Sequence, residues 1–399
     1  MIILNGKYNE SKVFTDNIEE SAKEQIIELL NQGFVKGENI RIMPDVHAGA
    51  GCTIGFTSTI TNKVVPYLIG VDVGCGLLMV KLDRRIDNLD ELDSIIRHNI
   101  PSGFNVHEKP AFRVGDTLKE YISTLHCLKS ANINMDRALC SLGTLGGGNH
   151  FIELDEGDDG DQYLVVHTGS RYLGKQIATY YQNLAYEQLT DISNEKDKII
   201  KSLIEQGKQR EIQHELKKLE RPKVNKSLAY LEGDLFWEYL DDMHIAQNYA
   251  DFNRTLIINN ILLSLGIDVT YRISTIHNYI SEDFIVRKGA VYAGRGTELL
   301  IPINMRDGIL ICEGKGNPDW NYSAPHGAGR ICSRGKAREL FSTDEFKSEM
   351  DGIYSTCVNE STLDESPMAY KPMDEIIKNI GDTVKIKKVV KPIYNFKAN

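Results

Sequence analysis

The hydrophobic positions of this chain switch irregularly between helical and strand-like spacing. Apolar residues recur at three- and four-residue intervals over residues 18–31, and Gly33 follows, so the pattern predicts a helix that ends there. Similar spacing predicts helices at 89–96 and 117–128 and one or two more within 228–265. Shorter apolar runs predict strands, at 40–43, 64–69, 76–82, 151–154, 163–166, 269–274, 284–286, 299–301 and 308–312.

This irregular mixture predicts an α+β fold rather than a doubly wound sheet. We expect one large mixed α/β domain over residues 1–399, with central β-sheets and flanking helices; no internal repeat is visible. Residues 174–225 differ from the rest, because long charged and polar side chains dominate them and Pro222 interrupts them. They predict a helical excursion, a solvated hairpin that projects from the core, with a partner-binding element as the less favoured alternative.

Two predicted connections between strands carry residues with functional potential. Asp72 and Cys75 fall on a glycine-rich turn between the predicted strands 64–69 and 76–82. The predicted strands 151–154 and 163–166 form a hairpin joined by the acidic loop 155–161. His150 and His167 lie at opposite ends of this hairpin sequence. Whether their side chains meet therefore depends on the register of the two strands.

Composition excludes several classes of protein. The 399 residues can bury a large core without disulfides or structural metals. The seven cysteines form no CxxC pair, so neither a disulfide framework nor a zinc ribbon is expected, and a reducing cytoplasmic location fits best. We also expect no signal peptide and no membrane segment. The net charge of −10 argues against coating nucleic acid by bulk electrostatics, although a few arginines in a cleft could still bind a phosphate end.

Five of the ten histidines lie in short segments that combine metal-binding or acidic side chains, mostly with glycines around them. These segments are 43–51, 70–76, 146–153, 165–171, 277–278 and 326–330. Each histidine alone is more typical of a hydrogen-bonded core or turn residue, and Cys75 alone of a small buried hydrophobe. Together they indicate a site that could form one or two metal coordination shells, from Asp72, Cys75, His150, His167 and His277. A thiolate can bridge two divalent ions, and the mixed ligands leave Mn²⁺, Zn²⁺, Fe²⁺ and Co²⁺ open.

A second group of residues indicates an anionic substrate. His326 lies among residues too small to shield it, and arginines follow at 330 and 334, whose planar groups suit phosphate oxygens. Arg171 and Lys288 are further cations close to the metal-binding segments, whereas Arg287 is expected to be a surface charge. Polyphosphate, an RNA phosphate end or a nucleotide would all fit. No Walker motif and no dinucleotide fingerprint is present.

Taken in order, these segments resemble the RNA-splicing ligase (RtcB) family. The resemblance runs from Asp45 to Lys397 through PDVHAGAG, GVDVGCG, GGGNHFIE, VHTGSR, HN, RKGA, HGAGR with SR, and AYK. It implies GTP- and Mn²⁺-dependent joining of an RNA 3′-phosphate or 2′,3′-cyclic phosphate end to a 5′-hydroxyl end, in RNA repair or tRNA splicing. RNA and GTP are the implied partners, and an activating protein is a further candidate.

The resemblance also implies a role for each matching residue. Asp72 and His150 would hold one Mn²⁺, His167 and His277 the other, and Cys75 would bridge them. His326 would carry GMP, and Asp45 would help to activate the RNA end, as a proton acceptor for the 5′-hydroxyl. The implied guanylate pocket consists of Asn149, Phe151, Glu153, Asn278, Asn304, Tyr370 and Lys397. The implied phosphate contacts are Asn149, Arg171, Lys288, Arg330 and Arg334.

The chain departs from the family at residues 302–308, where many members have a Pro-Gly-Ser-Met-Gly loop. Here Asn304 takes the place of the serine, and Arg306 and Asp307 add a charge pair. One alternative function is a dinuclear-metal cyclic phosphodiesterase or phosphatase that acts on RNA ends without ligation. Another is a non-catalytic sensor of RNA ends. Neither would need His326 as a nucleophile, which is why the ligase is favoured.

Overall fold

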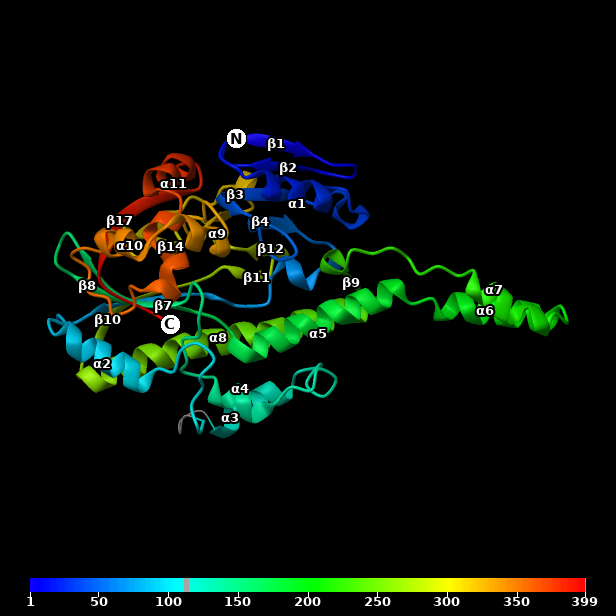
Figure 1. The fold of residues 1–399 in the computed structure, drawn as a ribbon, viewed down its shortest axis with the longest axis horizontal. Coiled ribbons are helices and arrows are strands. Elements are labelled where there is room, and N and C mark those ends of the chain that lie inside the picture. The colour runs from blue at the N-terminus through cyan, green and yellow to red at the C-terminus, as the bar shows by residue number, and fades with distance from the viewer. Residues whose placement is uncertain (111–114, 399) are drawn as a thin grey trace.

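The computed structural model describes residues 1–110 and 115–398. Within them, strands far apart in sequence build two main sheets (Figure 1). The first sheet has the order β1 (Ile2–Asn5), β2 (Glu10–Val13), β3 (Ile40–His47), β4 (Ile54–Thr59), β12 (Ile285–Lys288) and β11 (Asn278–Ile280). The second has the order β10 (Val269–Ile276), β6 (Gly76–Leu82), β8 (Gln162–Thr168), β7 (Phe151–Gly157), β17 (Val384–Lys397), β15 (Gly308–Gly314) and β14 (Glu298–Asn304). Two short ribbons, β13 (Ala290–Tyr292) with β16 (Ser323–Pro325) and β5 (Lys63–Val64) with β9 (Leu231–Glu232), complete the strands.

The helices surround the sheets, so the predicted mixed α+β fold is confirmed. They are α1 (Glu20–Leu30), α2 (Leu89–Asn99), α3 (Gly115–Ser123), α4 (Met135–Cys140), α5 (Arg171–Thr190), α6 (Ser193–Glu205), α7 (Ile212–Lys217), α8 (Asp234–Leu265), α9 (Arg334–Leu340), α10 (Thr343–Glu349) and α11 (Met373–Ile380). Local signals fix several ends: Asn88 caps α2 through the amide of Glu91, and Gly266 closes α8 in the left-handed region. No helix within the described residues is long and apolar enough to cross a membrane.

The central hairpin β7–β8 is buried on both faces, and its alternating side chains belong to different parts of the core. Leu164 and Val166 pack in a cluster with Ile257 and Ile261 of α8, while Val165 packs in a second cluster with Leu300 of β14. This two-residue alternation explains why the whole of β8 is apolar except at its ends. The two clusters thus pack against opposite faces of the hairpin, and this packing fixes the positions of the residues at its ends.

The helical excursion is shorter than the sequence predicted. Its first part, α5, belongs to the core, because Leu173, Ile177 and Tyr181 are fully or almost fully buried and α5 lies alongside α8. Only α6 and α7 project from the molecule (Figure 1), and neither of these two fully described helices has a buried residue. The excursion therefore begins near 193, not at 174, because α5 buries an apolar face that the charged composition of the segment conceals.

Other expectations from the sequence need smaller corrections. Residues 66–68 form a 3₁₀ turn that starts at Pro66, not part of a strand. The hairpin strands run to Gly157 and from Gln162, so residues 155–157 of the acidic segment belong to β7 and the loop is confined to 158–161. The predicted helix 117–128 is regular over 115–123 only, and the 228–265 segment holds one long helix, α8. Arg287 is fully buried rather than a surface charge, and donates to Ser281, Ser323 and the carbonyl of Asn321.

Candidate active site

Among the described residues, two groups of potential metal ligands lie together and share Cys75. Asp72, Cys75 and His150 form one group, and Cys75, His167 and His277 form the other. Cys75 Sγ is 3.5 Å from His150 Nε2 and 3.4 Å from His167 Nε2. His150 Nε2 is 2.9 Å from Asp72 Oδ2, and His167 Nε2 is 3.1 Å from His277 Nε2. The structure thus brings together all five residues that the sequence analysis grouped as metal ligands.

Strand register explains this meeting. In the β7–β8 hairpin Phe151 pairs with His167, so His150 lies one residue beyond the pair and the two imidazoles are neighbours. On the other side of β8, Leu77 pairs with His167, and β6 therefore starts beside it with Cys75 just before the strand. Strand β10 pairs Ile276 with Gly76, and the amide of His277 donates to the carbonyl of Cys75 at 2.9 Å. The register of these four strands therefore sets the ligand positions.

Hydrogen bonds at the Nδ1 atoms orient the histidine rings. His150 Nδ1 lies 3.0 Å from the carbonyl of Leu145, and His167 Nδ1 lies 3.1 Å from the carbonyl of Asn149. Because a carbonyl can only accept, each Nδ1 carries a proton, and Nε2 is the atom of each ring that faces the other potential ligands. His277 Nδ1 donates to Asn278 Oδ1 at 3.2 Å, and this amide oxygen also accepts from the amide of Gly289. The Nε2 atoms of His167 and His277 thus face each other with lone pairs, an arrangement that a cation between them would stabilise.

The electrostatics of the group agree with cation binding. Burial lowers the pKa of His167 and of His277 well below the usual value, and neighbouring imidazoles add to the effect, so both rings are neutral. Burial opposes ionisation of Asp72, but the hydrogen bond and charge of His150 and the charge of Arg171 outweigh it and lower its pKa to about 2. Burial and Asp72 raise the pKa of the Cys75 thiol, which would need a bound cation to become a thiolate. The donor set fits one or two divalent ions of the Mn²⁺ or Zn²⁺ type.

His326 lies next to these ligands and is held by one carboxylate. Its Nδ1 is 2.6 Å from Asp45 Oδ2, its backbone amide donates to the same oxygen at 3.1 Å, and its ring centroid is 4.6 Å from that of His277. Asp45 Oδ1 is buried and has no hydrogen-bond partner among the described residues. At Gly329, where φ is +77°, a Cβ atom would collide with the Asp45 carbonyl, so glycine lets the HGAGR segment close over Asp45.

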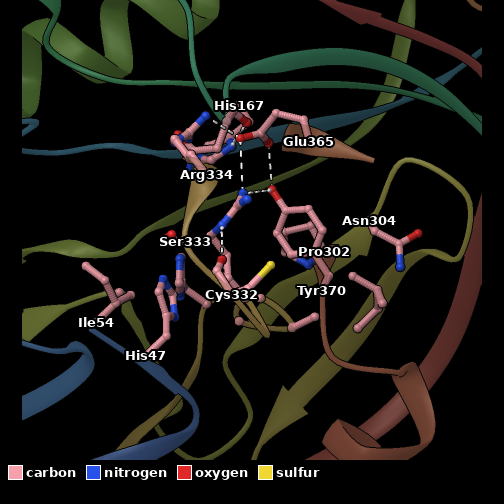
Figure 2. A pocket seen from close by; sticks show the side chains of 18 of the residues that line it. His47, Ile54, His167, Pro302, Asn304, Cys332, Ser333, Arg334, Glu365 and Tyr370 are labelled. Carbon is pink, nitrogen blue, oxygen red and sulfur yellow. Dashed lines mark hydrogen bonds and ion pairs between the residues drawn. The ribbon is translucent and has the colours of Figure 1, made fainter. Parts of the chain in front are cut away.

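A cavity of about 680 Å³ opens above His326. It is lined by all seven residues assigned to the guanylate pocket, together with His167, His277, His326, Arg330 and Arg334 (Figure 2). A volume of this size can hold a nucleotide and part of a second ligand. Asp72, Cys75, His150 and Asp45 do not line the cavity; they lie behind the histidines that do.

Two of the four cations predicted to bind phosphate, Lys288 and Arg171, lie outside the cavity. Lys288 is buried, and its Nζ donates to the carbonyls of Ala50, Cys52 and Tyr67. Burial lowers its pKa to about 8. Arg171 has positive φ and lies against the glycine segment at 146, with its guanidinium 3.4 Å from the hydroxyl of Thr144. Neither residue lines the cavity. Through its three hydrogen bonds, Lys288 connects the 50–52 segment with Tyr67.

Glu365, an acidic residue that the sequence analysis did not identify, forms ion pairs with three cations that line the cavity. Glu365 is buried, and its carboxylate lies 2.6 Å from Arg334 Nη1, 3.1 Å from Lys397 Nζ and 3.4 Å from Arg330 Nη1. Tyr370 donates to it at 2.6 Å (Figure 2). Burial would raise its pKa, but Lys397 and Arg334 outweigh burial and hold the pKa at about 2. No glycine-rich motif surrounds Glu365, and its position shortly before AYK is the one signal in the sequence; the structure places it at the end of a 3₁₀ turn.

Glu153 has the opposite environment within the same cavity. It accepts from the side-chain amide of Asn395, and burial raises its pKa to about 8 although Lys397 counteracts this. Asp155, two residues along the same strand, is also fully buried, and burial together with the charge of Glu153 raises its pKa. Glu153 is therefore largely protonated at neutral pH. Both of its carboxylate oxygens can accept hydrogen bonds only when the group ionises.

The divergent 302–308 segment comprises the end of β14 and the turn into β15 at the cavity's edge. Asn304 lines the cavity, its Oδ1 accepts from the amides of Arg306 and Asp307, and its Nδ2 donates to Asp307 Oδ2 at 2.8 Å. Arg306 pairs with Asp307 at 2.8 Å and also with Glu349 of α10. The expected charge pair is present, and it holds the Asn304 amide in one orientation.

The chain matches the family model described as tRNA-splicing ligase RtcB over residues 25–398. It is 31% identical to the RNA-splicing ligase RtcB of Escherichia coli K12, with 92% of each chain covered. It is also 26% identical to the tRNA-splicing ligase RtcB of Methanococcus maripaludis, covering 94% of this chain and 91% of the relative. For that of Nanoarchaeum equitans the identity is 24%, over 84% and 83% of the two chains. The chain therefore belongs to the RtcB family of ligases.

Proposed function

We propose that this protein is a GTP- and Mn²⁺-dependent RNA ligase. It joins RNA 3′-phosphate or 2′,3′-cyclic phosphate ends to 5′-hydroxyl ends through a guanylylated histidine. The observation that supports this best is the position of His326. Asp45 accepts a hydrogen bond from Nδ1 of the ring, so Nε2 is the nitrogen that can act as a nucleophile, in a cavity that also contains the His167–His277 pair.

In the first step, His326 Nε2 attacks the α-phosphorus of GTP. A nitrogen–phosphorus bond forms, the bond to the bridging oxygen breaks, and pyrophosphate leaves with the electron pair. Asp45 stabilises the positive charge that develops on the imidazole, as the carboxylate of a catalytic triad does. Arg330 and Arg334 line the cavity and offset the charge of the phosphates.

The five-residue ligand group fits two divalent ions, with Asp72 and His150 on one side, His167 and His277 on the other, and Cys75 between them. Bound ions of this kind would supply Lewis acidity to phosphate oxygens. The Nδ1 hydrogen bonds of His150 and His167 orient the two rings so that their Nε2 atoms face the ligand group.

The guanine end of the cavity is assigned to Glu153, Tyr370, Lys397, Phe151 and Asn304. Asn149 and Asn278 lie near the His167–His277 pair. The backbone carbonyl of Asn149 accepts from His167 Nδ1, and the side-chain Oδ1 of Asn278 accepts from His277 Nδ1. The GMP moiety would thus extend from the metal side to the β14–β15 loop. It would then pass from His326 to the RNA 3′-phosphate and leave when the 5′-hydroxyl attacks.

The decisive experiment combines two measurements on the purified chain with Mn²⁺. Incubation with α-labelled GTP should give an acid-labile label on the protein, and His326→Ala should abolish it. A broken stem-loop RNA with 2′,3′-cyclic phosphate and 5′-hydroxyl ends should then be sealed by the wild-type chain only. Opening of the cyclic phosphate without label or sealing would instead indicate a phosphodiesterase. Comparison of GTP with ATP tests the donor against the altered 302–308 loop.

A further inference from the structure

One imidazole of the cavity has no role in the scheme above. His47 lies at the end of β3, is half-buried and lines the cavity. Its Nδ1 is 2.9 Å from the backbone carbonyl of Asp45. Because the carbonyl can only accept, Nδ1 carries the ring proton and Nε2 has a free lone pair.

Asp45 therefore fixes two imidazoles at once. Its carboxylate binds Nδ1 of His326 at 2.6 Å, and its backbone carbonyl binds Nδ1 of His47 at 2.9 Å. Both rings therefore donate through Nδ1, and Nε2 is the nitrogen that remains for reaction. The first ring has a role as the nucleophile, which leaves the second available for proton transfer.

The position of His47 separates it from the guanylate residues. In Figure 2, His47 and Ile54 lie on one side of the pocket, and Asn304, Pro302 and Tyr370 lie on the other. Ala48, next to His47 in the chain, and Glu19, which accepts from the Ala48 amide, also line the cavity, and neither belongs to the guanylate set. A second substrate, the RNA 5′-end, would occupy this side while GMP fills the other.

Asp45 itself is poorly placed to take a proton from RNA. Its side chain is fully buried, it does not line the cavity, and its Oδ2 already accepts both from the ring and from the amide of His326. The nearest group on the same segment that does reach the cavity is the His47 ring.

We propose that His47 is a further catalytic residue, the acceptor of the proton that the RNA 5′-hydroxyl loses in the joining step. The 5′-oxygen forms a bond to the phosphorus of the guanylylated RNA 3′-end, and its proton moves to His47 Nε2. The bond from that phosphorus to the GMP oxygen breaks, and GMP leaves with the electron pair. This role rests on the proposed function.

The charges around His47 are compatible with this role. Burial lowers its pKa to about 4, and positive charge on His326 and Arg330 acts in the same direction, while the Asp45 carbonyl and carboxylate act against it. Glu19 is the further carboxyl group on this side, and it accepts from the amide of Ala48 at 2.6 Å. The ring is thus an unprotonated acceptor at neutral pH. Phosphates of RNA and GMP would add negative charge and raise the pKa towards the range of an effective base.

Two variants separate proton transfer from structural support. His47→Asn keeps an amide donor for the Asp45 carbonyl but has no ring nitrogen, whereas His47→Ala removes both. His98→Gln, which removes an exposed imidazole on α2, is the matched control. Three single-turnover rates are measured with Mn²⁺ present: labelling of the protein by α-labelled GTP, transfer of GMP to an RNA 3′-phosphate without a 5′-hydroxyl partner, and sealing of purified guanylylated RNA to a 5′-hydroxyl strand.

We expect both His47 variants to label and transfer at nearly the wild-type rate and to seal about 10²–10⁴-fold more slowly. In a plot of the wild-type sealing rate against pH, the rate should fall tenfold for each pH unit on the acidic side. His47→Asn should lack this dependence on pH. Sealing by His47→Asn at the wild-type rate would overturn the proposal, as would an equal loss of labelling and sealing. If the wild-type chain takes no label at all, the proposed function itself fails, which is a distinct result.

Discussion

The cavity above His326 and the α6–α7 hairpin both contain several charged residues, but these residues are held in opposite ways. In the cavity, charged side chains are buried and have partners from distant parts of the chain, as Glu365 does with Lys397, Arg330 and Arg334. In the hairpin, Lys218 pairs with Glu215 three residues away, and no residue of its two fully described helices is buried. Polar residues in the cavity are therefore coupled to the fold, and those in the hairpin are not.

The largest effect is expected from Cys75→Ala. Cys75 is shared by both ligand groups, so its loss removes a donor from each. Loss of an outer partner of a ligand costs about 10–100-fold in metal affinity, and loss of a shared direct ligand should cost at least about 100-fold. Mn²⁺ titration followed by metal analysis measures this. Cys312→Ala, which removes another buried thiol in a separate apolar cluster, should bind Mn²⁺ like the wild type. Equal affinity of the two variants would contradict the assignment of Cys75.

Glu365→Gln tests the buried charge cluster. Removing its negative charge leaves the Lys397 and arginine charges uncompensated in a buried site, which should cost about 3–5 kcal/mol of unfolding free energy. It should also weaken nucleotide binding. Because the folded pKa is about 2, the contribution of Glu365 is present above the unfolded value near 4.5 and is lost as pH falls. Urea unfolding at pH 7 and pH 3 measures both effects, with the exposed Glu360→Gln at the start of the same turn as control.

Glu153→Gln should change the pH dependence of stability in the opposite direction. The folded pKa is about 8, so the proton on Glu153 favours the folded state below the unfolded value near 4.5, and this contribution is lost as pH rises towards 8. The variant should therefore lose less stability than the wild type between pH 5 and pH 8. Thermal melts across this range measure the difference, with Glu24→Gln on the exposed face of α1 as control. Parallel curves for wild type and Glu153→Gln would rule out the buried, protonated state.

The smallest effect is expected when residues 193–217 are replaced by a short Gly-Ser linker. The deleted helices bury no residue, so the melting temperature should change by only a few degrees. GTP labelling and sealing of a short stem-loop should stay within about threefold of the wild type. A selective loss of sealing would show that the hairpin takes part in binding RNA, and the contrast between the two regions would then no longer hold.

Sequence reasoning succeeded where a residue type carries its own meaning. The histidines and Cys75 stood out because such donors rarely gather among glycines, and the structure brings them together. It failed where burial decides the role. Arg287 was expected as a surface charge and Lys288 as a phosphate contact, yet both are buried and bind carbonyl or hydroxyl groups. Glu365 was missed because an acidic residue in a polar turn is ordinary until its three cations come from elsewhere.

The sequence by itself determined the kinds of donor, the strands that carry them and the glycines that allow close approach, because these follow from local chemistry and two-residue alternation. Only the tertiary structure decided which donors meet, since Cys75 and His150 are 75 residues apart and His167 and His277 are 110 apart. It also decided protonation: the same carboxyl chemistry gives Glu365 a pKa of about 2 and Glu153 a pKa of about 8. The physical reason is that burial penalises charge unless a partner compensates it, and the partners are assembled only by the fold.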